Sequence, residues 1–86
     1  MNDRIRIDFA IMEGAVLRVL GLVERRGYCV HGIGMTEHED GETASLVLDV
    51  APRDSGRGLD VLALQLRRLV GIRSVSRSPF EMAGAA

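Results

Sequence analysis

The chain has 86 residues, enough for one small domain that folds alone around a thin core. Its 11 basic and 12 acidic residues give a formal net charge of −1 without a basic stripe, which argues against a nucleic-acid partner. The single Cys29 excludes an internal disulfide, and the lack of a leader or a membrane-spanning apolar run predicts a cytoplasmic protein with no membrane partner.

The first predicted element is a strand over residues 4–9, where apolar Ile5, Ile7 and Phe9 alternate with polar side chains. Residues 13–26 then carry apolar side chains at helical spacing, which predicts a helix whose buried stripe is Val16, Val19, Leu20 and Val23. A glycine directly after this stripe, Gly27, is expected to end the helix in the left-handed conformation.

The second predicted strand, residues 28–35, is irregular because its inward parity changes between Val30 and Ile33. One extra residue would produce such a change, so we expect a bulge near His31 and Gly32.

A polar turn over residues 36–42 connects the second strand to a third strand over residues 45–50. Asp54 or Ser55 is then expected to cap a second helix. The apolar stripe of that helix is predicted to contain Leu59, Leu62, Ala63, Leu66, Leu69 and Val70. A short last strand follows over residues 72–75.

The order of elements repeats strand, helix, strand twice, which predicts the α+β class and a ferredoxin-like βαββαβ sandwich. We expect an antiparallel four-stranded sheet in spatial order 4-1-3-2, with two helices on one face. The domain is expected to span residues 1–78, and residues 79–86 to form a disordered tail. The predicted core is Ile5, Ile7, Phe9, Val16, Leu20, Val23, Leu46, Leu48, Leu62, Leu66 and Leu69.

Residues able to do chemistry are few. The candidates for metal binding or nucleophilic chemistry are Cys29, His31 and His38. These three residues are fewer than the four ligands of a closed metal site. The acidic cluster of Glu37, Glu39, Asp40 and Glu42 is interpreted as a solvated turn. No catalytic residue and no metal site is therefore predicted.

The loop of residues 10–15 leads into the first helix. Gly14 near the helix N-terminus leaves amides suited to a small anion such as an amino-acid carboxylate, but the same glycine also suits an ordinary helix start. The residues alone leave both readings open.

Two segments resemble a known family. The run Gly14 to Tyr28, with Arg25-Arg26-Gly27-Tyr28 at its end, is similar to the first helix of ACT domains in acetolactate synthase (acetohydroxyacid synthase) small regulatory subunits. The run Gln65 to Val75 is similar to the second helix and last strand of that family. The chain is similar in length to the short, single-ACT-domain form, the isozyme II small subunit type.

The resemblance implies a non-catalytic subunit that binds and activates the catalytic large subunit of acetolactate synthase in branched-chain amino-acid biosynthesis. Thiamine diphosphate, Mg and FAD are expected on that catalytic partner, and no cofactor on this chain. A homodimer joined at an edge formed by Val30, His31, Gly32, Ile33 and Gly34 is also expected.

The effector positions implied by the resemblance are Ile11, Met12, Glu13, Gly14 and Ala15. Ile11 stands where the family has the Asn that binds valine, and Glu13 stands where it has Pro, so we expect valine feedback to be weak or absent. The alternative is a free-standing ACT-type amino-acid-binding sensor module. An acylphosphatase-like enzyme is a distant third, because the loop lacks a phosphate-binding Arg.

Overall fold

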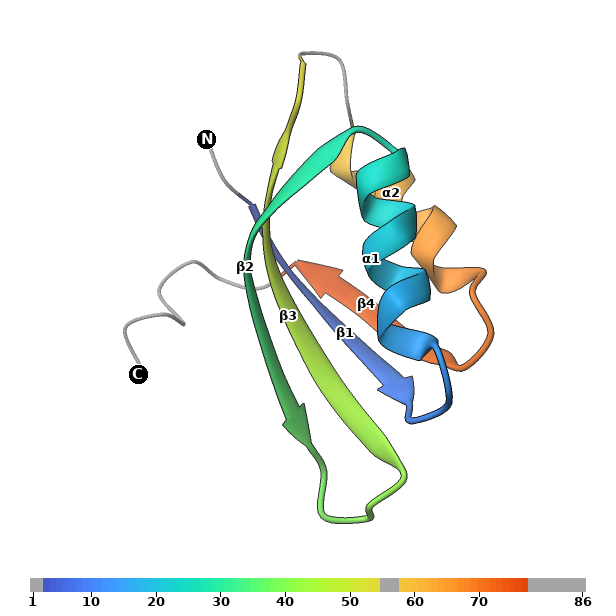
Figure 1. Ribbon diagram of the computed structural model, residues 1–86. Helices are drawn as coiled ribbons and strands as arrows, with labels where there is room; N and C mark the ends of the chain where they lie inside the picture. Colours follow the sequence, from blue (N-terminus) through green and yellow to red (C-terminus); the bar gives the residue numbers. More distant parts are fainter. Residues whose placement is uncertain (1–2, 55–57, 78–86) are drawn as a thin grey trace.

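The computed structural model describes residues 3–54 and 58–77. Its elements are β1 (Asp3–Ala10), α1 (Ala15–Arg25), β2 (Tyr28–Glu37), β3 (Thr43–Pro52), α2 (Leu59–Arg67) and β4 (Ile72–Arg77). The strands form one antiparallel sheet in the order β2-β3-β1-β4, and both helices cover the same face (Figure 1). The predicted ferredoxin-like fold and strand order are confirmed. The expected tail, residues 79–86, lies outside the described residues.

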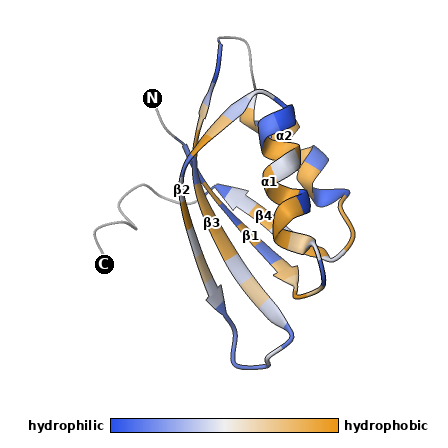
Figure 2. Ribbon diagram, in the orientation of Figure 1, coloured by the Kyte–Doolittle hydropathy of each residue, from blue (hydrophilic) through white to orange (hydrophobic). Residues whose placement is uncertain are grey.

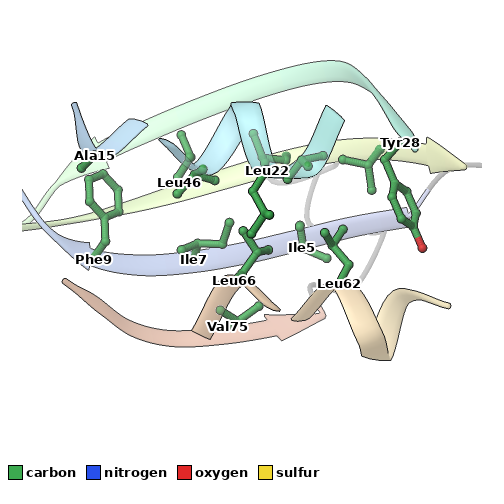
Figure 3. Packing of buried hydrophobic residues seen from close by; sticks show 14 of the residues in the cluster. Ile5, Ile7, Phe9, Ala15, Leu22, Tyr28, Leu46, Leu62, Leu66 and Val75 are labelled. Atoms are coloured by element: carbon green, nitrogen blue, oxygen red, sulfur yellow. The ribbon is translucent and has the colours of Figure 1, made fainter. Parts of the chain in front are cut away.

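The core lies between the helices and the inward faces of β1 and β3. Ile5 pairs with Leu48 and Ile7 with Leu46, so the apolar positions of both strands point toward the helices, as Figure 3 shows for several of them. The buried hydrophobic residues are Ile5, Ile7, Phe9, Ala15, Val19, Leu22, Val23, Tyr28, Ala44, Leu46, Leu48, Val50, Leu62, Leu66 and Val75.

Three predicted core residues are only partly buried. Val16, Leu20 and Leu69 pack against the outside of the core, whereas Val19 and Val23 of the predicted stripe are buried within it. The helical period predicted which side of α1 is apolar, but not which of its residues point to the sheet and which lie at the rim of the interface.

The predicted bulge in β2 is confirmed. Its pairing with β3 shifts between Val30 and Gly32, which leaves His31 as the extra residue. Beyond the shift, Ile33 lies opposite Leu48 and Met35 opposite Leu46, so the bulge returns both apolar side chains to the helix side of the sheet.

The ends of α2 differ from the prediction. Gly58, rather than Asp54, is the N-cap residue, and its carbonyl accepts hydrogen bonds from the amides of Val61 and Leu62. The helix ends at Arg67 because the chain then tightens into turns, and Val70 is left 73% exposed. Ser55, the other expected cap, lies outside the described residues. Over the described residues, neither helix has the length and apolarity needed to cross a membrane.

Candidate functional site

The loop between β1 and α1 is held in place by two neighbouring turns. The amide of Ala10 donates to the carbonyl of Gly71 over 2.8 Å, and the amide of Ile11 donates to the carbonyl of Glu42, also over 2.8 Å. The loop therefore lies where the β2–β3 turn and the connection from α2 to β4 come together, beside the end of β1 (Figure 1).

The first turn of α1 presents backbone donors at this loop. Gly14, the N-cap residue, has a φ of 77°, and no side chain caps the helix. The amide of Ala15 donates to the carbonyl of Met12 over 3.1 Å, and the amide of Arg18 to that of Gly14 over 2.9 Å. The intervening first-turn amides have no acceptor within the helix. The geometry of an anion-receiving helix N-terminus is thus present.

The first side chains of the loop are apolar and partly exposed. Ile11 is 39% exposed and Met12 is 38% exposed, and neither carries a side-chain hydrogen-bond donor. Met12 leans over Gly71, where an added Cβ would lie only 2.8 Å from the Met12 methyl carbon. Glu13 is exposed, whereas the side chain of Ala15 belongs to the core. The five predicted effector positions therefore divide into a four-residue surface loop and one core residue.

Arg18 is a charged neighbour of the loop that the sequence analysis missed. Its Nη2 donates to the carbonyl of Glu13 over 3.0 Å, and its guanidinium lies against Gly14, where a Cβ would come within 3.0 Å of Nη1. The signal was available, because a residue four positions after Gly14 lies one helical turn further along the same face. Arg18 places a positive charge beside the helix N-terminus.

The predicted dimer edge is the outer edge of the sheet, since β2 pairs with β3 alone among the described strands. Ile33 is 57% exposed, and no atom lies within 4 Å of a Cβ built on Gly34. His31 is exposed in the bulge, whereas Val30 packs partly against the core of its own domain.

Gly32, the remaining edge residue, makes room for an ion pair on the face of the sheet away from the helices. Arg4 donates from Nε and Nη2 to the two carboxylate oxygens of Asp49, over 2.6 and 3.2 Å. The hydrogen bond from Arg4 lowers the pKa of Asp49 against the opposing effect of burial. A Cβ at position 32 would lie 2.9 Å from Asp49 Oδ2.

Asp8 is the centre of a second polar group on this face. It accepts hydrogen bonds from Ser45, from Ser74 over 2.9 Å and from Arg6 over 3.3 Å. Burial raises the pKa of Asp8, but the hydrogen bonds from the two serines, with the charge and hydrogen bond of Arg6, outweigh burial and leave the pKa below its ordinary value.

The acidic turn has a structural role. Asp40 Oδ1 accepts the amides of Glu42 and Thr43 over 2.8 and 3.0 Å, and these bonds lower the pKa of Asp40. Figure 2 shows the β2–β3 turn as a hydrophilic segment, in agreement with the solvated turn expected from the sequence. Within residues 3–54 and 58–77, no group of three His, Cys, Asp or Glu side chains is placed to hold a metal ion.

The chain belongs to the ACT domain family, whose model matches residues 12–75. ACT domains are regulatory modules, so the fold and the loop just described define a regulatory domain. No curated protein sequence is significantly similar to the chain.

Solved structures of several ACT-containing proteins share the fold. The ACT domain of GTP pyrophosphokinase from Chlorobium tepidum has a TM-score of 0.73 at 18% identity, covering 91% of this chain and 97% of that one. The acetolactate synthase small subunit from Thermotoga maritima has a TM-score of 0.77 at 20% identity, covering 95% of this chain and 50% of that one. A formyltetrahydrofolate deformylase from Pseudomonas putida has a TM-score of 0.74 at 10% identity, covering 92% of this chain and 29% of that one.

Proposed function

We propose that this ACT domain is the regulatory and activating small subunit of acetolactate synthase, and that it responds weakly or not at all to valine. The support for the partner is the resemblance carried by residues 14–28 and 65–75. The first run forms α1 with the start of β2, and the second forms the end of α2 with the start of β4. Thiamine diphosphate, Mg and FAD would belong to the catalytic subunit, and this chain would act through protein contact.

The exposed side chain of Ile11 is the observation that carries this proposal. It is apolar and 39% exposed, at the position where the resemblance expects an amide side chain that binds the effector. Together with Met12 it gives the loop an apolar surface. Such a surface suits contact with a protein, and it lacks the side-chain amide that the resemblance expects to bind the amino acid.

Reconstitution tests the activating role. The purified chain should show no turnover of pyruvate alone, but should co-purify with the catalytic subunit of acetolactate synthase from the same source and raise its activity. The control is the catalytic subunit mixed with an equal amount of an unrelated small protein. If neither a complex nor activation is observed, the proposed function is wrong.

Valine binding separates this proposal from the alternative of an amino-acid sensor. Loss of a hydrogen bond to a charged group costs about 1.5–3 kcal/mol, or about ten- to over a hundredfold in affinity. Titration calorimetry with valine, leucine and isoleucine should therefore show weak or no binding, and Ile11→Asn should strengthen the binding of valine. Micromolar binding by the unmodified chain would favour the sensor.

The active form is proposed to be a homodimer joined through β2. This edge has open strand groups, and its Ile33 is 57% exposed on the helix side of the sheet. Sedimentation should show a dimer that Ile33→Lys weakens. Val61→Lys is the matched control, because Val61 is 58% exposed but lies on α2. A monomer at high protein concentration would contradict the dimer.

A further inference from the structure

A continuous chain of hydrogen bonds crosses the open face of the sheet and links β1 to the β2–β3 turn. The hydroxyl of Ser45 bonds to Asp8, and Nε2 of His38 lies 2.7 Å from the same hydroxyl oxygen. On the other side of the ring, Nδ1 of His38 lies 2.7 Å from Oγ1 of Thr43, which in turn donates to Asp40 Oδ2 over 2.9 Å. His38 is thus the central member of the chain.

The number of protons available in this chain of hydrogen bonds fixes the role of the His38 ring. An ionised carboxylate only accepts, so the single proton of Thr43 goes to Asp40 and that of Ser45 goes to Asp8. Both hydroxyl oxygens are then acceptors toward the ring. All the hydrogen bonds are made together only when both ring nitrogens of His38 donate, and only the imidazolium ion does so.

The charged groups around the ring come from two segments, β1 and the β2–β3 turn. Asp8 on β1 places Oδ1 3.9 Å from Nε2, and Asp40 lies in the turn on the Nδ1 side. Arg6, also on β1, opposes them, because its Nη2 donates to Ser45 over 3.1 Å. Ser45 and Thr43 on β3 and Ser74 on β4 contribute neutral hydroxyls. The His38 ring, which is 35% exposed to solvent, therefore has two carboxylates and one guanidinium near it.

We propose that His38 is a protonation-dependent latch that fastens the β2–β3 turn to β1 when its ring is charged. When the ring loses a proton, one nitrogen becomes an acceptor, and Ser45 or Thr43 must turn its hydroxyl away from its carboxylate to meet it. One link of the chain is then lost. The latch is independent of the proposed partner, since it uses only this chain's own residues.

The latch has a route to the β1–α1 loop. The carbonyl of Glu42, inside the fastened turn, accepts the amide of Ile11 over 2.8 Å. The amide of Thr43 also donates to Asp40, so the acceptor for Ile11 lies between residues held by the latch. A change in the protonation of His38 therefore reaches the loop that the fold places at the N-terminus of α1.

Nuclear magnetic resonance of the full chain from pH 5 to 8 tests the latch. The chain has two histidines, and His31 in the β2 bulge serves as the internal control. Ring-nitrogen shifts should show both nitrogens of His38 protonated at the acid end. The amide signals of Ile11 and Glu42 should change with pH together with the ring-nitrogen signals of His38. Amide exchange in the β2–β3 turn should be about two- to tenfold faster at the basic end, after correction for its intrinsic pH dependence.

Two variants make the test decisive. His38→Gln and the near-isosteric Thr43→Val should each abolish the pH response of the Ile11 amide, whereas His31→Gln should leave it intact. Thr43→Val keeps the ring and the strand propensity of position 43, so it answers the question even if His38→Gln folds poorly. Amide signals that do not follow His38, or a response that persists in both variants, would overturn the proposal.

Discussion

The two faces of the sheet are built from the same strands but are stabilised by different interactions. On the helix-covered face, Ile7, Leu46 and Leu48 are each 0% exposed and fill a continuous apolar core. On the open face, the alternate residues of β1 and β3 form pairs across the strands, among them Arg4 with Asp49 and Asp8 with Ser45. Strand alternation alone separates the two sets.

The difference shows which surfaces remain for partners. The core face is covered by the helices, and many polar side chains of the open face are hydrogen-bonded to one another across β1, β3 and β4. The β2 edge and the β1–α1 loop keep exposed apolar side chains, of which Ile33 is 57% and Ile11 39% exposed. Isolated exposed apolar residues are ordinary, but these two lie at an open strand edge and at a helix N-terminus.

The largest expected effect is on the core face. Leu66→Ala should lower the free energy of unfolding by about 2–5 kcal/mol, because Leu66 is 0% exposed and its truncation leaves a cavity under α2. Denaturant unfolding measures this directly. Leu64→Ala is the matched control on the same helix, since Leu64 is 56% exposed and should cost less than about 1 kcal/mol. Equal losses in the two variants would show that the buried face of α2 is wrongly assigned.

A smaller effect is expected on the open face. Gly32→Ala should cost about 1 kcal/mol, because its Cβ would lie 2.9 Å from Asp49 Oδ2 and force that side chain away from Arg4. Gly34→Ala is the control, since nothing lies within 4 Å of its added Cβ. In an Asp49→Ala background the cost of Gly32→Ala should disappear. The free energies of unfolding of all these variants should be measured at one protein concentration. If Gly32→Ala still costs stability in the Asp49→Ala background, position 32 needs glycine for its backbone and not for the space it leaves to Asp49.

The fold could be predicted from the sequence because its signals are local. Alternation along β1 and β3, the left-handed glycine after α1 and the parity change in β2 each report on a few consecutive residues. The ends of α2 were mispredicted for the opposite reason. Its N-cap residue, Gly58, makes no side-chain cap, and the turns after Arg67 are held by hydrogen bonds between backbone groups, so neither end has a side-chain signature.

The sequence indicated where the β1–α1 loop and the β2 edge lie in the fold, but not their contacts, and their roles as effector site and dimer edge stay predictions. The loop and the edge were placed by the order of elements, yet the bonds from Arg18 to Glu13 and from Ile11 to Glu42 depend on how the chain folds back. The hydrogen bonds through His38 could not be predicted for the same reason. Their members are brought together by the register of β1 on β3. Ser45 lies 37 residues from Asp8 in the sequence, and pairs with it directly in the sheet.

The smallest expected effect is the pH dependence of the open face. The folded pKa of Asp49 lies below its ordinary unfolded value of about 3.9, chiefly because of the hydrogen bond from Arg4. Its contribution to stability is therefore complete above that unfolded value and is lost as the pH falls through the folded pKa. Asp8 and Asp40, whose pKa values are also lowered, act with the same sign.

Unfolding measured between pH 7 and 3 should show stability falling most steeply below about pH 4. Asp49→Asn should be slightly less stable at pH 7 but should lose less on acidification, because one depressed carboxyl no longer takes up a proton on unfolding. Arg4→Met should reduce the acid slope in the same way, since it removes the bond that holds the pKa of Asp49 down, and the double variant should add little more. An acid slope unchanged in both single variants would contradict the pairing of Arg4 with Asp49.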